Sequence, residues 1–271
     1  MMNFPERAAN SVLDKLSISA PDDLLHLKKI VYARGAIYRE WPIQGAEARL
    51  MIGQGKPIIT VSSSSMINSH RRRFSIAHEL GHLELHRGMG LLMSCTNQDI
   101  QYKPDNTDID TEQEANQFAS AFLMPARFVE EPFTENEPSF DLISNWATKL
   151  QTSLTATAFR FAQFTPEPIA VVFSYKGVIQ YFQPSSEFLE LGVFPDVKNC
   201  MGSTTSAYKL FHNMPTTNQW YEVKASEWFR ENNDAFDKTD IIKEWSISMP
   251  SYEAVLSLLW AHEPLGEELD W

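Results

Sequence analysis

The chain has 271 residues, 43% of them hydrophobic and 12% aromatic, which is enough to bury a sizeable core in one large domain or two smaller ones. Its 35 acidic and 23 basic residues give a net charge of −12, which argues against general binding to nucleic-acid backbones. Two cysteines exclude a disulfide framework, and the sequence shows no signal-peptide pattern and no apolar run of about 20 residues. We therefore expect a cytoplasmic protein with reduced thiols that does not enter a membrane.

The N-terminal part of the chain predicts two helices followed by a hairpin. Apolar spacing predicts a helix over residues 6–18, and Pro21 with two following aspartates marks the start of a second helix. Residues 35–42 are expected to be extended. Residues 48–52 and 57–61 are two strand-like runs on either side of a glycine-rich turn, which predicts a β-hairpin.

Residues 73–82, with the sequence Arg-Phe-Ser-Ile-Ala-His-Glu-Leu-Gly-His, contain the pattern H-E-x-x-H. On an α-helix residues i and i+4 lie on the same face, so His78 and His82 can point their imidazoles at one metal ion. Glu79 would lie beside that ion, where it can take a proton from a metal-bound water. Gly81 costs the helix about 1 kcal/mol relative to alanine, which indicates that something packs closely there. The pattern also occurs by chance, so a third ligand decides the matter.

Several residues that flank this motif have plain structural interpretations. The triplet Arg71-Arg72-Arg73 is too short to indicate nucleic-acid binding, and we expect at least one of these side chains to pair with a carboxylate or dock on the helix scaffold. His86 lies one turn beyond His82, and three ligands on one helix cannot surround a metal ion, so His86 is expected to support the site. Residues 88–108 are predicted to be a loop, and this loop contains Cys95.

The next predicted helix, residues 111–123, offers the missing ligand. A catalytic zinc site needs three protein ligands and an open position for water. Glu112 shares one helix face with small residues such as Ala115, which would let this helix lie close against Gly81. Glu114 lies on a different face. The spacing therefore favours Glu112 as the third ligand.

From residue 126 onward the sequence predicts a mixture of helices and strands. Helices are expected at 126–131, 140–150, 154–164 and 205–211, hairpin strands at 169–174 and 178–182, further strands at 220–223 and 245–249, and a final helix at 252–260. The proline-containing stretch 165–168 predicts a boundary between a domain of residues 1–165 and one of residues 166–271. The expected class is α+β, with a small α+β domain at the end.

Two motifs in this order and spacing resemble those of the ImmA/IrrE family of metallopeptidases. One is Arg-Phe-x-x-Ala-His-Glu-Leu-Gly-His at 73–82, and the other is Glu-x-x-Ala-Asn-x-Phe-Ala-x-x-Phe-Leu-Met-Pro at 112–125. The resemblance covers roughly residues 8–165. It implies a zincin-like metallopeptidase fold of the gluzincin type. It also implies zinc ligands at His78, His82 and Glu112 and a general base at Glu79.

The family resemblance further implies a regulatory protease that cleaves a protein partner. Such enzymes are usually encoded beside a helix-turn-helix repressor of the Xre/Cro type, and cleavage of the repressor switches on phage-defence, mobile-element or DNA-damage response genes. Some members carry a C-terminal sensor domain, often GAF-like. Residues 166–271 occupy that place, and a small molecule or single-stranded nucleic acid is the expected kind of effector there.

Some details of such a site stay open at the level of sequence. A thiolate from Cys95 could occupy the fourth zinc position and keep the enzyme latent, because thiolate is a strong zinc ligand, or Cys95 is an ordinary cysteine. Tyr102, His86 and His70 are candidates for stabilising an oxyanion. The strand Ile58 to Val61 is expected to be an edge on which an extended substrate could pair. The alternatives to a regulatory protease are a zinc-stabilised module that sequesters the repressor and a housekeeping peptidase.

Overall fold

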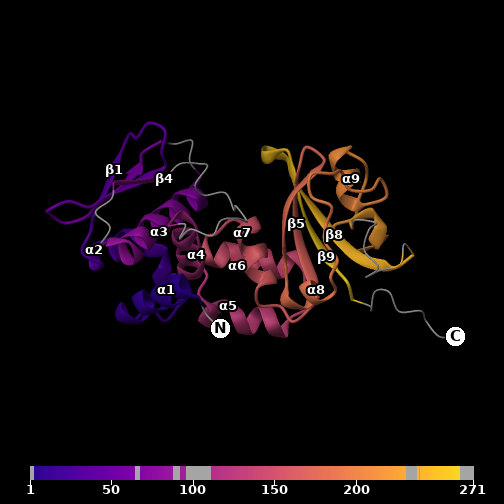
Figure 1. Cartoon of the computed structure of the whole chain (residues 1–271), viewed down its shortest axis with the longest axis horizontal. Helices are drawn as coiled ribbons and strands as arrows, with labels where there is room; N and C mark the ends of the chain where they lie inside the picture. Colours follow the sequence, from indigo (N-terminus) through magenta and orange to yellow (C-terminus); the bar gives the residue numbers. More distant parts are fainter. Residues whose placement is uncertain are drawn as a thin grey trace. The chain divides into compact units, whose positions relative to one another are not determined.

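A computed structural model of the chain describes residues 3–64, 68–87, 111–229, 237 and 239–262, together with the backbone of 92–95. The chain divides into two compact units, Met1–Val129 with Asn145–Ala156 and Glu130–Ser144 with Thr157–Trp271. Each unit combines helices with one β-sheet, which confirms the predicted α+β class (Figure 1). The compact units do not divide the chain at residue 165. The domain boundary expected between residues 165 and 166 stays a prediction. Among the described residues, no helix has the length and apolar character needed to cross a membrane.

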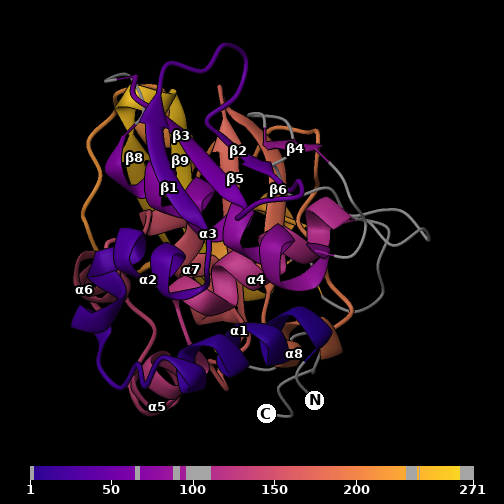
Figure 2. The same ribbon diagram turned by 90° about the vertical axis from the view of Figure 1, so that its left-hand side faces the viewer.

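The sheet of the first unit has four strands in the order β1-β3-β2-β4 (Figure 2). These strands are β1 (Ile37–Trp41), β2 (Ala48–Met51), β3 (Ile58–Ser62) and β4 (Leu92–Cys95). The predicted β2–β3 hairpin is confirmed, with Leu50 opposite Ile59 in an antiparallel register. The expectation that Ile58 to Val61 forms an edge is wrong, because β1 pairs with β3 on its other side. β4 pairs with β2 and lies inside the segment that was expected to be a loop.

Helices of the first unit lie beneath this sheet (Figure 1). They are α1 (Phe4–Lys15), η1 (Pro21–His26), α2 (Leu27–Ala33), α3 (Ser69–Leu85) and α4 (Thr111–Leu123), where η marks a 3-10 helix. α3 packs against β2 and β3 on one side, and α4 packs against both α3 and α1. The fully buried side chains of Leu50, Ile59, Leu80, Leu83 and Phe118 belong to the core between these elements. This core fixes α3 and α4 side by side.

Arginines at the start of α3 attach it to its surroundings. Arg73 is 8% exposed and donates hydrogen bonds to the carbonyl oxygens of Leu24 and Leu150, at 3.0 and 3.3 Å. Arg71 forms an ion pair with Glu47 at 2.8 Å, and the same carboxylate accepts a hydrogen bond from the Ser75 hydroxyl at 2.9 Å. The expectation that these arginines serve the scaffold is confirmed. Their bonds hold the axial position of α3.

The second unit is built on a five-stranded antiparallel sheet in the order β6-β5-β9-β8-β7. Its strands are β5 (Ile169–Tyr175), β6 (Val178–Pro184), β7 (Tyr221–Lys224), β8 (Ile241–Met249) and β9 (Ala254–Trp260). The predicted β5–β6 hairpin is confirmed. The helix expected at 252–260 is wrong, because this run forms β9, the central strand. Helical cover on both faces buries β9 almost continuously, and such a run cannot be told from a buried helix by periodicity.

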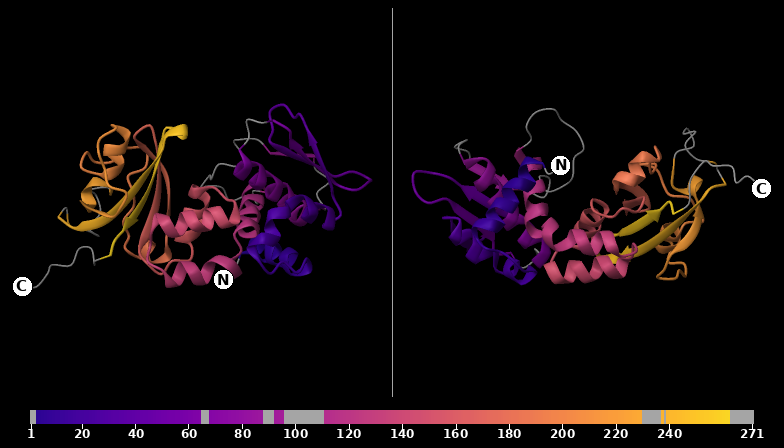
Figure 3. Two further views of the ribbon diagram at one scale, coloured as in Figure 1. Left: turned by 180° about the vertical axis from the view of Figure 1, so that it is seen from behind. Right: turned by 90° about the horizontal axis from the view of Figure 1, so that it is seen from below.

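Helices cover both faces of this sheet (Figure 3). The remaining helices of the chain are α5 (Ala126–Glu135), α6 (Phe140–Leu150), α7 (Leu154–Ala162), α8 (Ser186–Glu190) and α9 (Ser206–Phe211), with short 3-10 turns η3 (Ala225–Glu227) and η4 (Pro250–Tyr252). On one face, Phe188 of α8 and Ala207 of α9 join the buried core. On the other face, Phe140 packs on Trp245 and Phe159 packs on Tyr181, with ring centroids 5.8 and 5.7 Å apart. The GAF-like character of this unit stays a prediction.

Candidate metal centre

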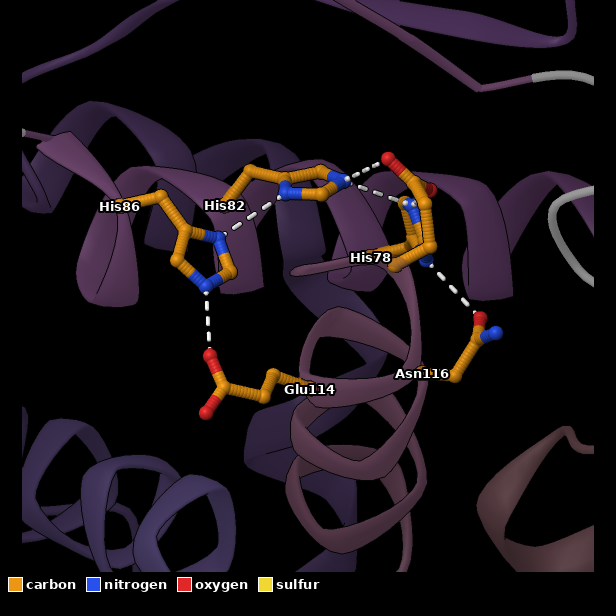
Figure 4. A network of polar contacts seen from close by, with 6 residues as sticks. His78, His82, His86, Glu114 and Asn116 are labelled. Atoms are coloured by element: carbon orange, nitrogen blue, oxygen red, sulfur yellow. Dashed lines mark hydrogen bonds and ion pairs between the residues drawn. The ribbon is translucent and has the colours of Figure 1, made fainter. Parts of the chain in front are cut away.

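α3 and α4 cross in direct backbone contact at Gly81. A Cβ atom added to Gly81 would lie 3.2 Å from both the Cα and the carbonyl oxygen of Ala115, and 3.1 Å from the Phe118 ring. The glycine therefore lets the two helices approach so closely that even a methyl group would be crowded there, as the sequence predicted. From this crossing the side chains of α4 reach α3 on both sides: Asn116 extends toward His78 and Glu114 toward His86 (Figure 4).

Three side chains from the two helices converge on one point. Glu112 Oε2 lies 3.1 Å from His78 Nε2, and Glu112 Oε1 lies 3.3 Å from His82 Nε2. The two Nε2 atoms are 3.0 Å apart. Ligand atoms of all three residues lie within 4.8 Å of one another, a cluster that could hold a metal ion. Two imidazole nitrogens and one carboxylate oxygen are a donor set that fits zinc.

Burial differs among these three residues in a way that suits a reactive centre. His78 and His82 are 0% and 1% exposed, whereas the Glu112 side chain is 30% exposed. The site thus has a closed side formed by α3 and an accessible side at the start of α4. A catalytic metal site needs such an opening for water and substrate.

The two histidines are held from behind by further polar residues. His78 Nδ1 lies 3.0 Å from Asn116 Oδ1. His82 Nδ1 lies 3.1 Å from His86 Nδ1, and His86 Nε2 lies 2.8 Å from Glu114 Oε2. His86 therefore lies behind His82 rather than in the three-residue cluster, in agreement with its expected supporting place.

Known proteins share this part of the chain. The sequence profile of the IrrE N-terminal-like domain, peptidase family M78, matches residues 42–162, which include both helices of the cluster. The chain carries an ImmA/IrrE family domain. The radiation response metalloprotease IrrE of Deinococcus deserti is 27% identical over 106 residues, which are 39% of this chain and only 37% of that protein. The match thus covers well under half of the relative.

A solved structure extends the similarity beyond the ImmA/IrrE domain. A Mycobacterium tuberculosis transcriptional regulator matches 96% of this chain and 77% of its own, with a TM-score of 0.56 and 12% sequence identity. At this identity the likeness concerns the fold alone. The match includes residues of both units and is not confined to the ImmA/IrrE domain.

The ionisation of the cluster in the ImmA/IrrE domain suits metal binding. Burial opposes the charged form of Glu112, but the neighbouring imidazoles of His78 and His82 outweigh burial and lower the pKa of its carboxyl to about 2. Burial also lowers the pKa of His82, more strongly than its contact with Glu112 raises it. Both effects favour deprotonated groups at neutral pH, and deprotonated groups are the ones that bind metal ions.

Other predicted residues of this domain have mixed outcomes. Glu79 follows His78 on α3 and is completely buried, and its role as a base stays a prediction. His70 Nδ1 lies 2.6 Å from the Thr152 carbonyl oxygen, which makes it a poor candidate for an oxyanion donor. Tyr102 and the side chain of Cys95 lie outside the described residues. The backbone of Cys95 pairs with Ala48 at the end of β4.

Sequence reasoning missed two residues that support the cluster. No role was predicted for Asn116, although it follows Ala115 directly in α4. Glu114 was placed on a different face from Glu112 and therefore left without a role. The predicted contact of Ala115 with Gly81 does not by itself show that a second face of α4 also reaches α3. The four-residue spacing of His78, His82 and His86 could have indicated that three histidines on one face of α3 each need a polar partner.

Proposed function

We propose that this protein is a zinc-dependent regulatory endopeptidase. The observation that carries the proposal is the convergence of His78, His82 and Glu112 within 4.8 Å, at a crossing of two helices. Glu79, buried directly beside the first histidine, adds the group that peptide hydrolysis requires. The ImmA/IrrE family match supports the same activity, and one relative is named a metalloprotease.

In this proposal the chain's own residues divide the work of peptide hydrolysis. Bound zinc would lower the pKa of a coordinated water toward about 7 and polarise the substrate carbonyl. His78, His82 and Glu112 hold the ion and leave one side open. Glu79 takes a proton from the attacking water and passes it to the leaving amine nitrogen, which makes the amine a neutral leaving group.

The proposed substrate is a protein partner, most simply an Xre/Cro-type helix-turn-helix repressor. Its cleavage would derepress phage-defence, mobile-element or DNA-damage response genes, as the family resemblance implies. An extended substrate segment could add to the sheet of the first unit by β-augmentation. Because β3 is internal, the outer strands β1 and β4 are the places for such pairing among the described strands.

Substitution of Glu79 by glutamine tests this function. Purified wild-type protein with zinc is incubated with the product of a neighbouring helix-turn-helix gene as the candidate repressor, and cleavage is followed by mass spectrometry. Glu79→Gln should keep zinc and partner binding but lower the cleavage rate by about 10²–10⁴-fold, the usual contribution of a general base. The matched control, Glu84→Gln, removes a carboxylate of α3 that pairs with Arg34 at 2.8 Å, away from the cluster.

Three other outcomes of this experiment would redirect the assignment. Binding of the repressor without any cleavage would indicate the alternative, a zinc-stabilised module that sequesters its partner. Cleavage of generic short peptides as fast as the repressor would indicate a housekeeping peptidase. Cleavage that survives in Glu79→Gln would contradict the proposed base.

We further propose that Cys95 keeps the resting enzyme latent by supplying a thiolate to the fourth zinc position. The support is its place at the end of β4, a strand that packs against α3. Cys95→Ala should then raise basal cleavage, and Cys200→Ala, which removes the exposed second cysteine, is the control. Equal basal rates for wild type and Cys95→Ala would contradict the latency mechanism.

Regulation by an effector is proposed for the second unit. A groove of about 460 Å³ lies at one end of its sheet and is lined by residues such as Lys176, His212, Ser248 and Glu253. This volume suits a small molecule better than a strand of nucleic acid. Ligand screening by thermal shift, with cleavage as the second readout, tests whether a small molecule there activates the enzyme.

A further inference from the structure

Behind His82, one of the proposed zinc ligands, lie the buried side chain of His86 and the partly buried side chain of Glu114 (Figure 4). We propose that His86 and Glu114 are positioning residues: they fix the imidazole of His82 in the one tautomer that presents a lone pair at Nε2. This inference rests on the proposed zinc function and names what that site needs beyond its ligands.

The direction of each hydrogen bond follows from the carboxylate of Glu114, the outermost group of the three. A carboxylate only accepts hydrogen bonds, so His86 must carry its proton on Nε2, 2.8 Å from Glu114 Oε2. A neutral imidazole has one N–H, so Nδ1 of His86 is an acceptor. His82 Nδ1, 3.1 Å away, must then be the donor. The Nε2 atom of His82 is left with a lone pair that faces Glu112.

The other histidine is fixed by a simpler partner. His78 Nδ1 donates to Asn116 Oδ1 at 3.0 Å, so its Nε2 also carries a lone pair. Two imidazole lone pairs 3.0 Å apart, with a carboxylate beside them, repel one another unless a cation lies between them. With both histidines protonated at Nδ1, the side chains of His78, His82 and Glu112 form a centre that requires a positive charge.

Helix geometry explains why Asn116 and Glu114, which contact two different histidines of α3, both come from α4. His78, His82 and His86 follow at intervals of four residues along one face of α3. α4 crosses this row at Gly81, so residues on the two sides of Ala115 meet different histidines. Because His86 is only 4% exposed, its nitrogens need protein partners, and His82 and Glu114 supply both.

A purely structural role predicts something different, and zinc affinity separates the two. If His86 and Glu114 only clamp α3 to α4, their loss lowers stability while the folded protein binds zinc as before. If they fix the tautomer, His86→Phe should weaken zinc binding by about 10–100-fold, the usual cost of losing a partner that orients a ligand. His86→Asn should recover much of this loss, because its Oδ1 can take the place of the acceptor Nδ1.

The experiment is a competition for zinc against a chromogenic chelator, with full-length folded protein at neutral pH. Glu114→Gln should weaken binding less than His86→Phe, because a glutamine oxygen still accepts from His86 without the negative charge. The matched control is Glu84→Gln, which removes another ion-paired carboxylate from the same helix pair and should leave zinc affinity unchanged.

A second readout needs neither metal nor activity. Nitrogen-15 NMR of histidine-labelled, zinc-free protein reports which ring nitrogen carries the proton. His82 should be protonated at Nδ1 in the wild type and should become a mixture of tautomers in His86→Phe. An unchanged zinc affinity in His86→Phe, or a wild-type His82 protonated at Nε2, would overturn the inference.

Failure of the inference is distinguishable from failure of the proposed function. If the wild type binds no zinc, or binds it equally well after His78→Ala, the zinc function fails. If the wild type binds zinc through His78 and His86→Phe binds it equally well, the zinc function stands and only the positioning role is lost.

Discussion

The two units each bury a carboxylate among polar partners, yet the two groups have opposite surroundings. In the second unit Glu244 is completely buried and accepts hydrogen bonds from donors alone. The donors are Ser206 N at 3.0 Å, Ala207 N at 2.7 Å, Trp228 Nε1 at 3.3 Å and Ser246 Oγ at 2.6 Å. In the first unit Glu112 faces the Nε2 atoms of His78 and His82.

This contrast separates a structural carboxylate from one suited to chemistry. Every donor on Glu244 is fixed by the fold, two of them at the N-terminus of α9, so no lone pair is left for a metal ion. The partners of Glu112 bear lone pairs of their own once their Nδ1 atoms are engaged. A buried acid indicates a functional centre when its neighbours are acceptors, and a structural one when they are donors.

The largest effect is expected from removal of the acid in the first unit. Glu112→Ala should weaken zinc binding by more than the about 10–100-fold that loss of an orienting partner costs, because a ligand itself is removed. Chelator competition measures this change. The metal-free variant should unfold close to the wild type, since the half-exposed site loses no core packing. Zinc affinity equal to the wild type would show that Glu112 is not a ligand.

Glu244→Gln should lower the free energy of unfolding and leave zinc affinity unchanged. The amide nitrogen of glutamine would face hydrogen-bond donors in either orientation, so at least one buried pair is lost, which costs about 1–3 kcal/mol of unfolding free energy. Urea unfolding followed by tryptophan fluorescence measures the loss, because Trp228 contacts this carboxylate. A change in zinc affinity in Glu244→Gln would contradict the separation between a structural and a functional acid.

Sequence reasoning succeeded where a local pattern determines the structure. α3 and α4 were predicted because the pattern that identifies each helix lies within one short segment of the sequence. β9 was mistaken for a helix because a central strand covered on both faces has no alternation. β4 was missed because its pairing with β2 is a long-range contact that four residues of sequence do not encode.

The candidate centre shows the same limit at the level of single residues. His78, Glu79 and His82 follow from spacing on one helix, and Glu112 follows from the need for a third ligand. Glu114 does not follow, because its partner depends on where α4 crosses α3. The contact between Gly81 and Ala115 was predicted, but the sequence does not show how α4 is inclined to α3, and this inclination decides that Glu114 reaches His86.

A substitution at the helix crossing tests how firmly the first unit depends on it. In Gly81→Val the added methyl groups would meet the backbone of Ala115, since even a Cβ lies only 3.2 Å from it. Overpacking of this kind costs about 1–3 kcal/mol, and it should also weaken zinc binding because Glu112 moves with α4. Gly81→Ala should show a smaller loss, because the better helix propensity of alanine offsets about 1 kcal/mol. Thermal unfolding with and without zinc measures both effects, and stable variants with full zinc affinity would contradict close packing as the cause.

The smallest effect is the response to pH of the acid in the second unit. Burial raises the pKa of Glu244 above 4.5 despite the hydrogen bonds that oppose the shift. A raised pKa means that the folded state holds the proton more tightly, so this group's contribution to stability is complete below pH 4.5 and is lost as the pH rises through the folded value. The lead of the wild type over Glu244→Gln should therefore shrink from pH 4.5 upward, as urea unfolding of zinc-free protein at a series of pH values would show. A wild-type lead that stays constant from pH 4.5 upward would contradict the raised pKa of Glu244.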